Sequence, residues 1–468
     1  MELNNDKLSL IVQRVLLEMN EKNLNKKTRD GIFNTMNEAI EAAEQAYKDL
    51  SYMTVSEREK LIRSMRKAIL DNAMEIADLC VKETKMGRKD HKYLKMKLVA
   101  EKTPGTEILA TKAYTGDKGL TLIEMSPYGV IGSIIPSTNP AATVACNSIG
   151  MIAAGNSVVF SPHPKAMECS LTTIKILNKA IREAGGPENL ITSVYKPKLE
   201  DTMTMINHSK VRMLVATGGT EIVKIALSSG KKAIGAGAGN PPVLVDDTAD
   251  IKKAARDIIK GCSFDNNLPC IAEKEAIVVE KVFEFFMEEI QKIEEVYELN
   301  EDEINKLLNL VLIEKGNNRF TLNKEYVGKD ANVILQSIGI NVLKHIECLV
   351  CRVSKDHPFV TEELMMPILP IVRAENFNEA LEIALQAEGG NRHTAVMHSK
   401  NVDNLTKMAR TINTTIFVKN APSYAGIGFG GEGYTTFTIA GPTGEGLTNA
   451  SSFTREVRCV MVDSFRII

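Results

Sequence analysis

From residue 130 onward the chain alternates between short apolar stretches and longer amphipathic ones, and this alternation limits the folds that it can adopt. The short stretches have the length and composition of buried strands, and the longer ones have the helical period and end at glycine. The predicted strands of this region are 130–135, 157–160, 191–195, 213–217 and 232–235, with helices at 141–154 and 166–184. Strands that alternate with helices through short turns favour a parallel sheet covered on both faces. The sequence therefore predicts a doubly wound α/β fold.

A second cycle of the same pattern begins at residue 243. It predicts a strand at 243–245, a helix at 250–261, a strand at 276–279 and a long charged helix at 282–297. The chain has 468 residues, which is too long for one simple core. We therefore expect a second α/β domain, with the active site in the cleft between the two domains.

The segment before residue 130 is predicted to be mainly helical at first and strand-like at residues 108–128. Two S/T-x-x-E patterns, Thr35 with Glu38 and Ser56 with Glu59, are typical of capping boxes at helix starts. Nearer the N-terminus, Leu8, Ile11, Val12, Val15 and Met19 are spaced as one face of a helix, followed by a polar linker at 21–30. The pattern leaves two interpretations open for residues 1–20: a docking helix, or a helix packed on the main body.

Composition excludes several classes of partner. The formal net charge is −2, so nothing favours nucleic acid or an anionic membrane. The chain has no secretory signal pattern and no apolar run long enough to span a bilayer. Its eight cysteines are too sparse for a disulfide scaffold, which indicates reduced thiols and a cytoplasmic protein. Cys348 and Cys351 lie in a predicted strand with no second pair at zinc spacing, so we expect no metal site.

Cys270 is the strongest candidate nucleophile. It follows Leu268 and Pro269 on a predicted turn outside any periodic core segment. A nucleophilic cysteine must be reachable and partly ionised, and a turn provides such a placement. The other cysteines of this half of the chain fit buried positions: Cys80, Cys146 and Cys169 in helical patterns, with Cys262 as a bystander close to Cys270.

Polar residues follow three of the predicted strands of the first domain, where ligands of parallel sheets usually bind. These segments are 136–140, 161–164 and 217–220. The Asn139 amide is able to donate a hydrogen bond to an oxyanion, although asparagine before proline is also a common turn residue. The stretch Gly235-Ala-Gly-Ala-Gly239 fails the dinucleotide fingerprint because Asn240 stands where the third glycine belongs. Its glycines instead suit a close approach of the backbone to a ligand.

Taken together, these motifs resemble the aldehyde dehydrogenase superfamily in order and spacing over nearly the whole chain after residue 30. The motifs are Pro136-x-x-Asn139-Pro140, Gly155-Asn156, Thr217-Gly-Gly-Thr220, Cys270 and Glu363-Leu-x-x-Pro367. The resemblance implies two doubly wound α/β domains and a small β oligomerisation arm. It makes Cys270 the nucleophile and Asn139 an oxyanion donor. It also implies that the cofactor is a dinucleotide, NAD. The residues that would bind it are Pro136, Ser161, Pro162, His163, Pro164, Thr217, Gly218, Gly219, Thr220, Glu363 and Pro367.

Two departures resemble the CoA-acylating branch. Hydrolytic members carry a water-activating glutamate in the segment that matches residues 235–240, and here that segment has no carboxylate. Ser161 stands where many members have a lysine against the adenosine ribose, which leaves room for a pocket shared with CoA. The segment around His393 also resembles that branch, which makes this histidine a catalytic candidate beside its simpler interpretation as an ordinary second-layer residue.

The resemblance is most specific to short-chain enzymes of bacterial microcompartments, of the propanediol- and ethanolamine-utilisation type. It implies oxidation of propionaldehyde or acetaldehyde to acyl-CoA, and it favours residues 1–20 as an encapsulation peptide that docks to a shell protein. It divides the rest into a dinucleotide-binding domain (31–235), a catalytic domain (236–425) and a returning segment (426–468). Dimers or tetramers are expected from the arm at 108–128 with strand 455–462. The alternatives are an acyl-phosphate-type semialdehyde dehydrogenase and a non-catalytic microcompartment scaffold.

Overall fold

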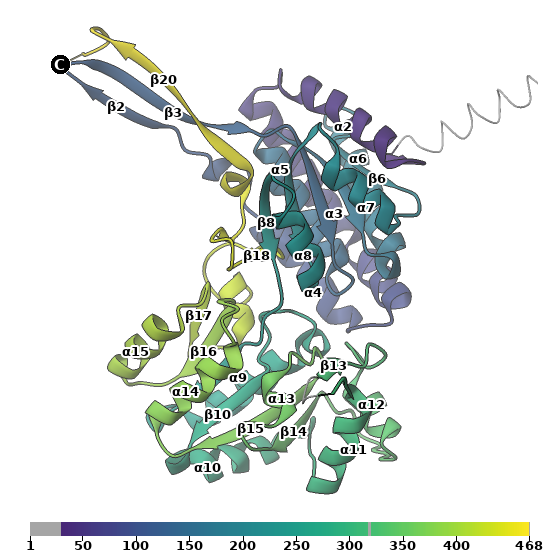
Figure 1. Cartoon of the computed structure of the whole chain (residues 1–468), viewed down its shortest axis with the longest axis vertical. Coiled ribbons are helices and arrows are strands. Elements are labelled where there is room, and N and C mark those ends of the chain that lie inside the picture. The colour runs from purple at the N-terminus through teal and green to yellow at the C-terminus, as the bar shows by residue number, and fades with distance from the viewer. Residues whose placement is uncertain (1–29, 317–319, 468) are drawn as a thin grey trace, which may run out of the picture.

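The computed structural model describes residues 30–316 and 320–467. The expected encapsulation peptide at 1–20 and nearly all of the linker at 21–30 lie outside the described residues. The described chain forms two α/β bodies, one above the other in Figure 1, and an arm that projects from the upper body. None of the described helices is long and apolar enough to cross a membrane.

The upper body is built on a six-stranded parallel sheet in the order β1-β6-β5-β4-β7-β8. Its strands are β1 (Ile32–Phe33), β4 (Val130–Ile135), β5 (Ser157–Pro162), β6 (Ile191–Val194), β7 (Val211–Thr217) and β8 (Lys232–Ala236). One face packs against α2 (Met36–Leu50), α7 (Leu199–Asn207) and α8 (Thr220–Leu227). The other packs against α3 (Val55–Thr84), α5 (Pro140–Ala153) and α6 (Met167–Glu183). Because successive strand residues point to opposite faces, Val130 joins the first layer and Ile131 the second.

The lower body contains a seven-stranded parallel sheet in the order β11-β14-β15-β10-β9-β16-β17. Its strands are β9 (Pro242–Val245), β10 (Glu275–Val279), β11 (Val296–Glu298), β14 (Cys348–Arg352), β15 (Ile368–Ala374), β16 (Thr394–His398) and β17 (Ile416–Lys419). Helices α9 (Ile251–Ser263) and α10 (Glu280–Gln291) cover one face. Helices α11 (Glu301–Val311), α12 (Ala331–Ser337), α14 (Phe377–Glu388) and α15 (Val402–Ile412) cover the other. The predicted doubly wound α/β class is confirmed.

Three strands form the arm. They are β2 (Lys112–Gly116), β3 (Gly119–Pro127) and β20 (Thr454–Val462), and they make an antiparallel sheet with β3 in the centre. The two predicted arm segments therefore pair with each other inside one chain, although they are far apart in the sequence. Figure 1 shows the sheet reaching well beyond the upper body.

Between β17 and the arm, the chain returns from the lower body to the upper one. This segment contains η4 (Ser423–Ile427), β18 (Ile439–Ala440), β19 (Gly446–Leu447) and η5 (Ala450–Phe453). Thr438 Oγ1 donates to Asn147 Oδ1 of α5 at 3.1 Å, and Asn156 Nδ2 donates to the Phe453 carbonyl at 2.9 Å. The two bodies are thus joined by two chain segments, this return and the 237–241 link between β8 and β9.

Two details of the predicted helices were wrong. Thr35 and Glu38 do form a capping box at α2, but the box of α3 is Thr54 with Glu57, not Ser56 with Glu59. The Thr54 hydroxyl accepts from the Glu57 amide and therefore fixes the first turn two residues earlier than expected. The predicted helix 282–297 ends at Gln291, because Val296 and Tyr297 pair with β14 as an edge strand.

Candidate active site

The first group of candidate residues lies along one edge of the upper sheet. Asn139 follows β4, Ser161 lies in the last part of β5, and Thr217 is the last residue of β7. Since these strands are parallel neighbours, all three positions are at the carboxyl edge of the sheet. The predicted gathering of polar residues at this edge is therefore present.

The second group of candidate residues lies at the amino edge of the lower sheet. Gly239 precedes β9, Cys270 precedes β10, Glu363 precedes β15 and His393 precedes β16. These four parallel strands are consecutive in the sheet, so the residues share its amino edge. The rule that ligands bind at carboxyl edges describes the residues of the upper sheet, whereas the lower sheet contributes its amino edge.

Gly239 is the point at which the second group meets. A β-carbon on this residue would stand 2.9 Å from the Cys270 carbonyl oxygen and 2.8 Å from His393 Cγ. The Gly239 amide in turn donates a hydrogen bond to the Glu363 carboxylate. Cys270, Glu363 and His393, which are far apart in the sequence, are therefore all in contact with one glycine.

The Cys270 side chain is partly exposed, whereas the other cysteines of the described bodies are buried. It is therefore reachable, as expected for a nucleophile. However, burial of the sulfur, followed by the Glu363 carboxylate, raises the pKa of the Cys270 thiol to about 12, against the opposing effect of Lys274. The partly ionised thiol that we expected is therefore not the resting form, and attack by Cys270 requires a group that takes its proton.

His393 is the candidate for such a group, because it contacts Gly239 as Cys270 does. Its backbone amide donates to Glu388 Oε1 at 3.0 Å, and its Nδ1 shares a hydrogen bond of 2.9 Å with the Thr394 hydroxyl. The other ring nitrogen, Nε2, is buried and has no partner among the described residues. Burial, followed by the charge of Lys274, lowers the pKa of His393 to about 4, so the ring is unprotonated near neutral pH and its charged form is disfavoured there.

The loop that leads into Cys270 is held in an unusual conformation. Asp265, Asn266 and Asn267 of η3 (Phe264–Asn267) all have positive φ, between 50° and 63°. Asn267 Nδ2 donates to the carbonyls of Cys262 and Glu273 at 2.9 Å each. Lys274 Nζ donates to Asn267 Oδ1 at 2.6 Å and to its carbonyl at 3.0 Å. Asparagine and aspartate tolerate this backbone region better than other side chains, and these contacts maintain it.

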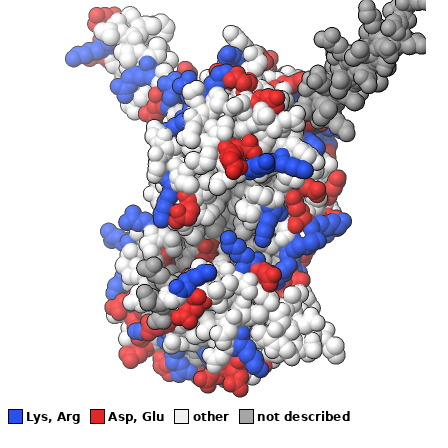
Figure 2. All heavy atoms as spheres, turned by 45° about the vertical axis from the view of Figure 1, so that its right-hand side comes forward, with Lys and Arg blue, Asp and Glu red and all other residues white. Residues whose placement is uncertain are grey.

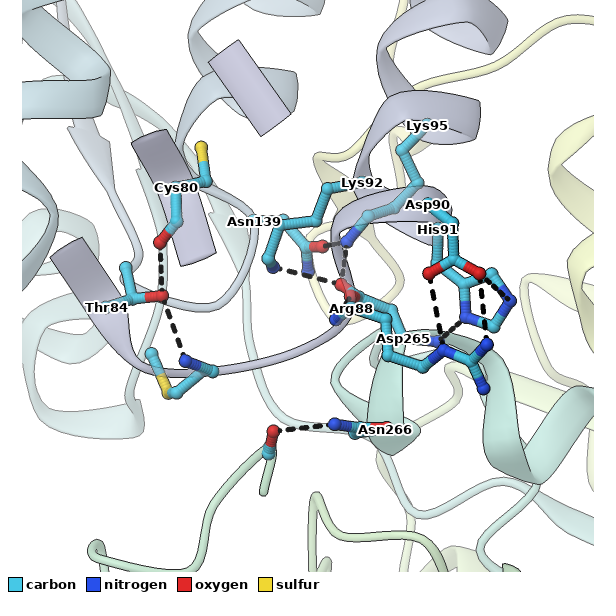
Figure 3. Close-up of polar contacts among 12 residues, drawn as sticks. Cys80, Thr84, Arg88, Asp90, His91, Lys92, Lys95, Asn139, Asp265 and Asn266 are labelled. Atoms are coloured by element: carbon cyan, nitrogen blue, oxygen red, sulfur yellow. Dashed lines mark hydrogen bonds and ion pairs between the residues drawn. The ribbon is translucent and has the colours of Figure 1, made fainter. Parts of the chain in front are cut away.

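A buried ion cluster connects the same loop to Asn139 (Figure 3). Asp265 is fully buried and pairs with Lys92, at 3.1 Å, and with Lys95, both on α4 (Lys89–Lys102). Lys95 also donates to Asn139 Oδ1. Although burial alone would raise it, the two lysines hold the pKa of Asp265 below its usual value, and burial lowers the pKa of Lys95 to about 8. Sequence reasoning missed this cluster.

The carboxyl edge of the upper sheet has features that fit a dinucleotide. Gly218 and Gly219 connect β7 to α8, a β-carbon on Gly219 would meet no atom within 4 Å, and no side chain caps the helix in the described chain. Uncapped amides at a helix start bind phosphate groups. The Thr217 and Thr438 hydroxyl groups share a hydrogen bond of 2.9 Å. The partly exposed Pro136 lies at the same edge.

The other predicted cofactor residues differ in how they are placed. His163 and Pro164 are exposed, and His163 Nδ1 accepts from the Lys165 amide at 3.1 Å. The Ser161 hydroxyl is buried against Thr202 at 2.7 Å, and Pro162 is also buried. Pro367 is buried at the entry to β15, where its carbonyl accepts from the Leu349 amide at 2.8 Å. Ser161, Pro162 and Pro367 are therefore buried rather than exposed at the surface. The described residues contain no group of three or more His, Cys, Asp or Glu side chains that could hold a metal.

Comparison with known proteins shows the family. Residues 26–452 match the aldehyde dehydrogenase family. The chain belongs to this family. This aldehyde dehydrogenase is 45% identical to the acetylating acetaldehyde dehydrogenase EutE of Salmonella typhimurium, over 100% of both chains.

Two solved structures extend the comparison of this aldehyde dehydrogenase. A propionaldehyde dehydrogenase from the fucose utilisation bacterial microcompartment of Clostridium phytofermentans has a TM-score of 0.91 and 53% identity, covering 94% of this chain and 100% of that one. A propionaldehyde dehydrogenase of Rhodopseudomonas palustris, solved with bound CoA and an acylated cysteine, has a TM-score of 0.90 and 54% identity, covering 93% and 98%. The expected family and fold are confirmed.

Proposed function

We propose that this aldehyde dehydrogenase oxidises a short aliphatic aldehyde, propionaldehyde or acetaldehyde, and transfers the acyl group to CoA. One observation carries the proposal. The segment 235–240 lies against the Cys270 carbonyl and the His393 ring through Gly239, and it contains no carboxylate that would activate water. The relatives support it, because one is named acetylating and another was solved with CoA and an acylated cysteine.

The first chemical step is attack of the Cys270 sulfur on the aldehyde carbon. We assign the thiol proton to His393 Nε2, which is unprotonated near neutral pH and has no other partner among the described residues. Because the low pKa of His393 makes this transfer uphill, the proton moves as the C–S bond forms. The C–S bond forms as the carbonyl π pair moves to oxygen. The Asn139 side-chain amide and a backbone amide stabilise that oxyanion, and removal of one such donor typically costs about 3 kcal/mol.

The residues for the hydride acceptor come mainly from the carboxyl edge of the upper sheet, and Glu363 comes from the amino edge of the lower sheet. The Gly218–Thr220 turn and the start of α8 would hold the phosphates of NAD, and Glu363 would hold the nicotinamide ribose. When bound, NAD would supply the acceptor for the hydride that leaves the adduct on Cys270, and the acyl group would then remain on the sulfur as a thioester. The open space at Gly219 and the exposed surface at His163 and Pro164 support the fit.

The second half-reaction transfers the acyl group from Cys270 to CoA. The CoA sulfur attacks the thioester carbonyl carbon, the bond from that carbon to Cys270 Sγ breaks, and acyl-CoA leaves. The proton that His393 took in the first step is released to solvent before CoA reacts, and it is the one proton that the overall oxidation produces. His393 then accepts the CoA thiol proton and passes it to the departing Cys270 sulfur. Sulfur is both a good nucleophile and a good leaving group, which explains why serine would be a poor substitute for Cys270.

We further propose that the enzyme works within a cytoplasmic bacterial microcompartment as a homodimer or homotetramer. The structural relative from Clostridium phytofermentans comes from such a compartment. The apolar spacing at residues 1–20 would dock to a shell protein by the helix-in-groove mode. The arm carries exposed apolar side chains, Tyr114, Val460 and Val462 among them, as a surface for subunit association would.

NADH formation from purified protein, NAD and propionaldehyde tests the proposal. Sustained turnover is expected with CoA, and NADH formation should stop after about one equivalent per active site when CoA is left out, because the acyl-enzyme accumulates. Equal turnover without CoA would make water the acceptor. Turnover that requires inorganic phosphate instead would support the acyl-phosphate alternative, and no turnover with any acceptor would favour the scaffold.

A further inference from the structure

We propose that Lys95 is a positioning residue that orients the Asn139 side-chain amide, so that the nitrogen of the amide and not its oxygen is available to the oxyanion. The inference rests on the proposed function, because it explains how the oxyanion donor of that reaction is kept in its useful orientation. It concerns a residue of α4, which is far from the family motifs in sequence.

The chemistry of the contact fixes the orientation of the amide. An ammonium group has three donors and no acceptor, so its partner on an asparagine must be the amide oxygen. Lys95 Nζ contacts Asn139 Oδ1, and both side chains are at least nine-tenths buried, Lys95 at 3% exposure and Asn139 at 9%. With Oδ1 held in this way, Nδ2 faces the opposite side of the amide. No described residue accepts a hydrogen bond from this nitrogen.

At the position of Asn139, the hydrogen bond to Lys95 takes the place of a helix-capping hydrogen bond. Asn139 is the N-cap residue of α5, where the side-chain oxygen of an asparagine normally accepts from an amide of the first helical turn. Here the side chain makes no capping hydrogen bond. The helix start is instead stabilised by Pro140 and by the Thr143 hydroxyl, which donates to the Asn139 carbonyl at 2.7 Å. The oxygen that would have capped the helix is bound to Lys95.

The same ammonium group is tied to the loop of the nucleophile. Lys95 pairs with Asp265, and the Asp265 carboxylate also accepts from the Arg88 amide at 2.8 Å. Asp265 is five residues before Cys270 in the loop with positive φ. Lys95 therefore connects the oxyanion donor on the upper body with the nucleophile loop on the lower body (Figure 3). It fixes the position of the Asn139 amide relative to that loop.

Lys92 provides a matched control. It lies one turn earlier on α4, is 5% exposed and binds the same Asp265 oxygen, at 3.1 Å. Among the described residues, no hydrogen bond joins Lys92 to Asn139. A lysine that only neutralises Asp265 should behave like Lys92, whereas a lysine that orients the amide should behave like Asn139. Loss of either lysine leaves Asp265 one cationic partner, so both variants keep the buried carboxylate paired.

The experiment compares Lys95→Met, Lys92→Met, Asn139→Ala and the Lys95→Met/Asn139→Ala double variant in the full-length enzyme. Two rates are measured: kcat for CoA-dependent NADH formation, and the burst of 4-nitrophenolate from 4-nitrophenyl acetate. The burst uses Cys270 and an oxyanion but neither NAD nor CoA. Melting temperature and the quenching of NADH fluorescence report whether each variant is folded and binds the dinucleotide.

We expect Lys95→Met to lower both rates by roughly 10- to 100-fold with little change in the aldehyde KM, since an oxyanion donor acts chiefly in the transition state. Lys92→Met should lower them by no more than about threefold. The double variant should match Asn139→Ala within about twofold, because Lys95 acts through that residue. Lys95→Arg, which keeps a donor, should recover part of the loss.

Equal losses in Lys95→Met and Lys92→Met, or a double variant whose losses multiply, would overturn the proposal. A wild-type enzyme that shows the ester burst but no CoA-dependent NADH formation would contradict the proposed function alone. The four burst rates would then still decide the role of Lys95.

Discussion

The Gly239 backbone lies so close to the His393 ring that a β-carbon on Gly239 would stand 2.8 Å from His393 Cγ. The same β-carbon would stand 2.9 Å from the Cys270 carbonyl oxygen. Only glycine allows the segment that lacks a carboxylate to lie this close to both the Cys270 backbone and the His393 ring. This contact explains why a glycine-rich stretch that fails the dinucleotide fingerprint is nevertheless part of the site.

Gly239→Ala is therefore expected to lower kcat by about 100-fold, because small displacements of reacting groups have large effects on rate. Gly237→Ala is the matched control, since a β-carbon there would meet no atom within 4 Å. CoA-dependent NADH formation measures both variants. Similar activity in the two would show that the close contact is not needed.

The raised pKa of Cys270 predicts how the thiol reacts before substrates bind. The alkylation rate by iodoacetamide should rise by about tenfold per pH unit between about pH 7 and about pH 10, because only the thiolate reacts. Peptide mapping separates Cys270 from the exposed Cys459, which serves as the internal control. A rate that levels off near neutral pH would mean that the resting Cys270 is already ionised.

Cys270→Ala tests the role of the thiol itself. We expect no NADH formation above background in this variant and normal quenching of NADH fluorescence, since the proposed phosphate-binding turn at Gly218–Thr220 lies in the upper body. Cys262→Ala is the control, because Cys262 is buried and close in sequence but has no proposed role in the reaction. Residual turnover of Cys270→Ala near the parent rate would refute the assignment.

Glu273 predicts a pH dependence of stability. It is fully buried behind the Cys270 loop, where its carboxylate accepts from the Ser423 amide and hydroxyl at 2.6 Å each. Burial raises its pKa to about 7, so the folded state binds a proton that the unfolded state releases above about pH 4.5. Its contribution to stability is therefore full at low pH and is lost as pH rises through about 7.

Glu273→Gln removes this titration. Relative to wild type, its stability should increase between about pH 4.5 and about pH 8, by up to about 3 kcal/mol. Melting temperatures across this range measure the difference, and the exposed Glu294→Gln should follow the wild-type profile. A constant difference between Glu273→Gln and wild type would mean that Glu273 does not titrate there.

The arm predicts the state of assembly. If the chain ends at Phe453, strand β20 is lost, and we expect a monomer with intact bodies in light scattering and circular dichroism. Val460→Asp places a charge on the exposed apolar surface of the arm and should weaken assembly without removing the strand. An unchanged oligomer in both variants would place the subunit interface elsewhere.

Much of the fold was predictable because its strands are fully buried. Strands β4, β5 and β6 have no exposed residue, and the glycine at 155, with a φ of +86°, ends the helix that separates the first two. Such strands appear as continuous apolar runs, which the alternation of the sequence shows plainly. The edge strand β11 has only three residues and follows a charged helix, so the sequence pattern does not separate it from that helix.

The site was predictable to a smaller extent. Motif order predicted Cys270, Asn139 and His393, which stay predictions, but nothing in the sequence indicated Lys95 or Asp265. Helix α4 has lysines around most of its surface, so a buried lysine cannot be told from a solvated one by spacing. Similarly, the residues at the amino edge of the lower sheet lie in loops, and only the parallel order of β15, β10, β9 and β16 brings them together.

The surface charge does not indicate a particular class of partner or ligand. Figure 2 shows acidic and basic side chains interspersed over the visible face, in agreement with the net charge of −2. The chemistry that we propose is instead concentrated in uncharged groups at the junction of the two bodies: a thiol, an amide and a neutral imidazole.

The central claim is that the acyl group is held on Cys270 until CoA removes it. Intact-protein mass spectrometry after mixing with propionaldehyde and NAD, without CoA, tests this most directly. We predict one added propionyl group per chain, located at Cys270 by peptide mapping, that disappears when CoA is added and reappears as propionyl-CoA. An unmodified protein that nevertheless forms NADH continuously, or an adduct that water removes as fast as CoA does, would contradict the account.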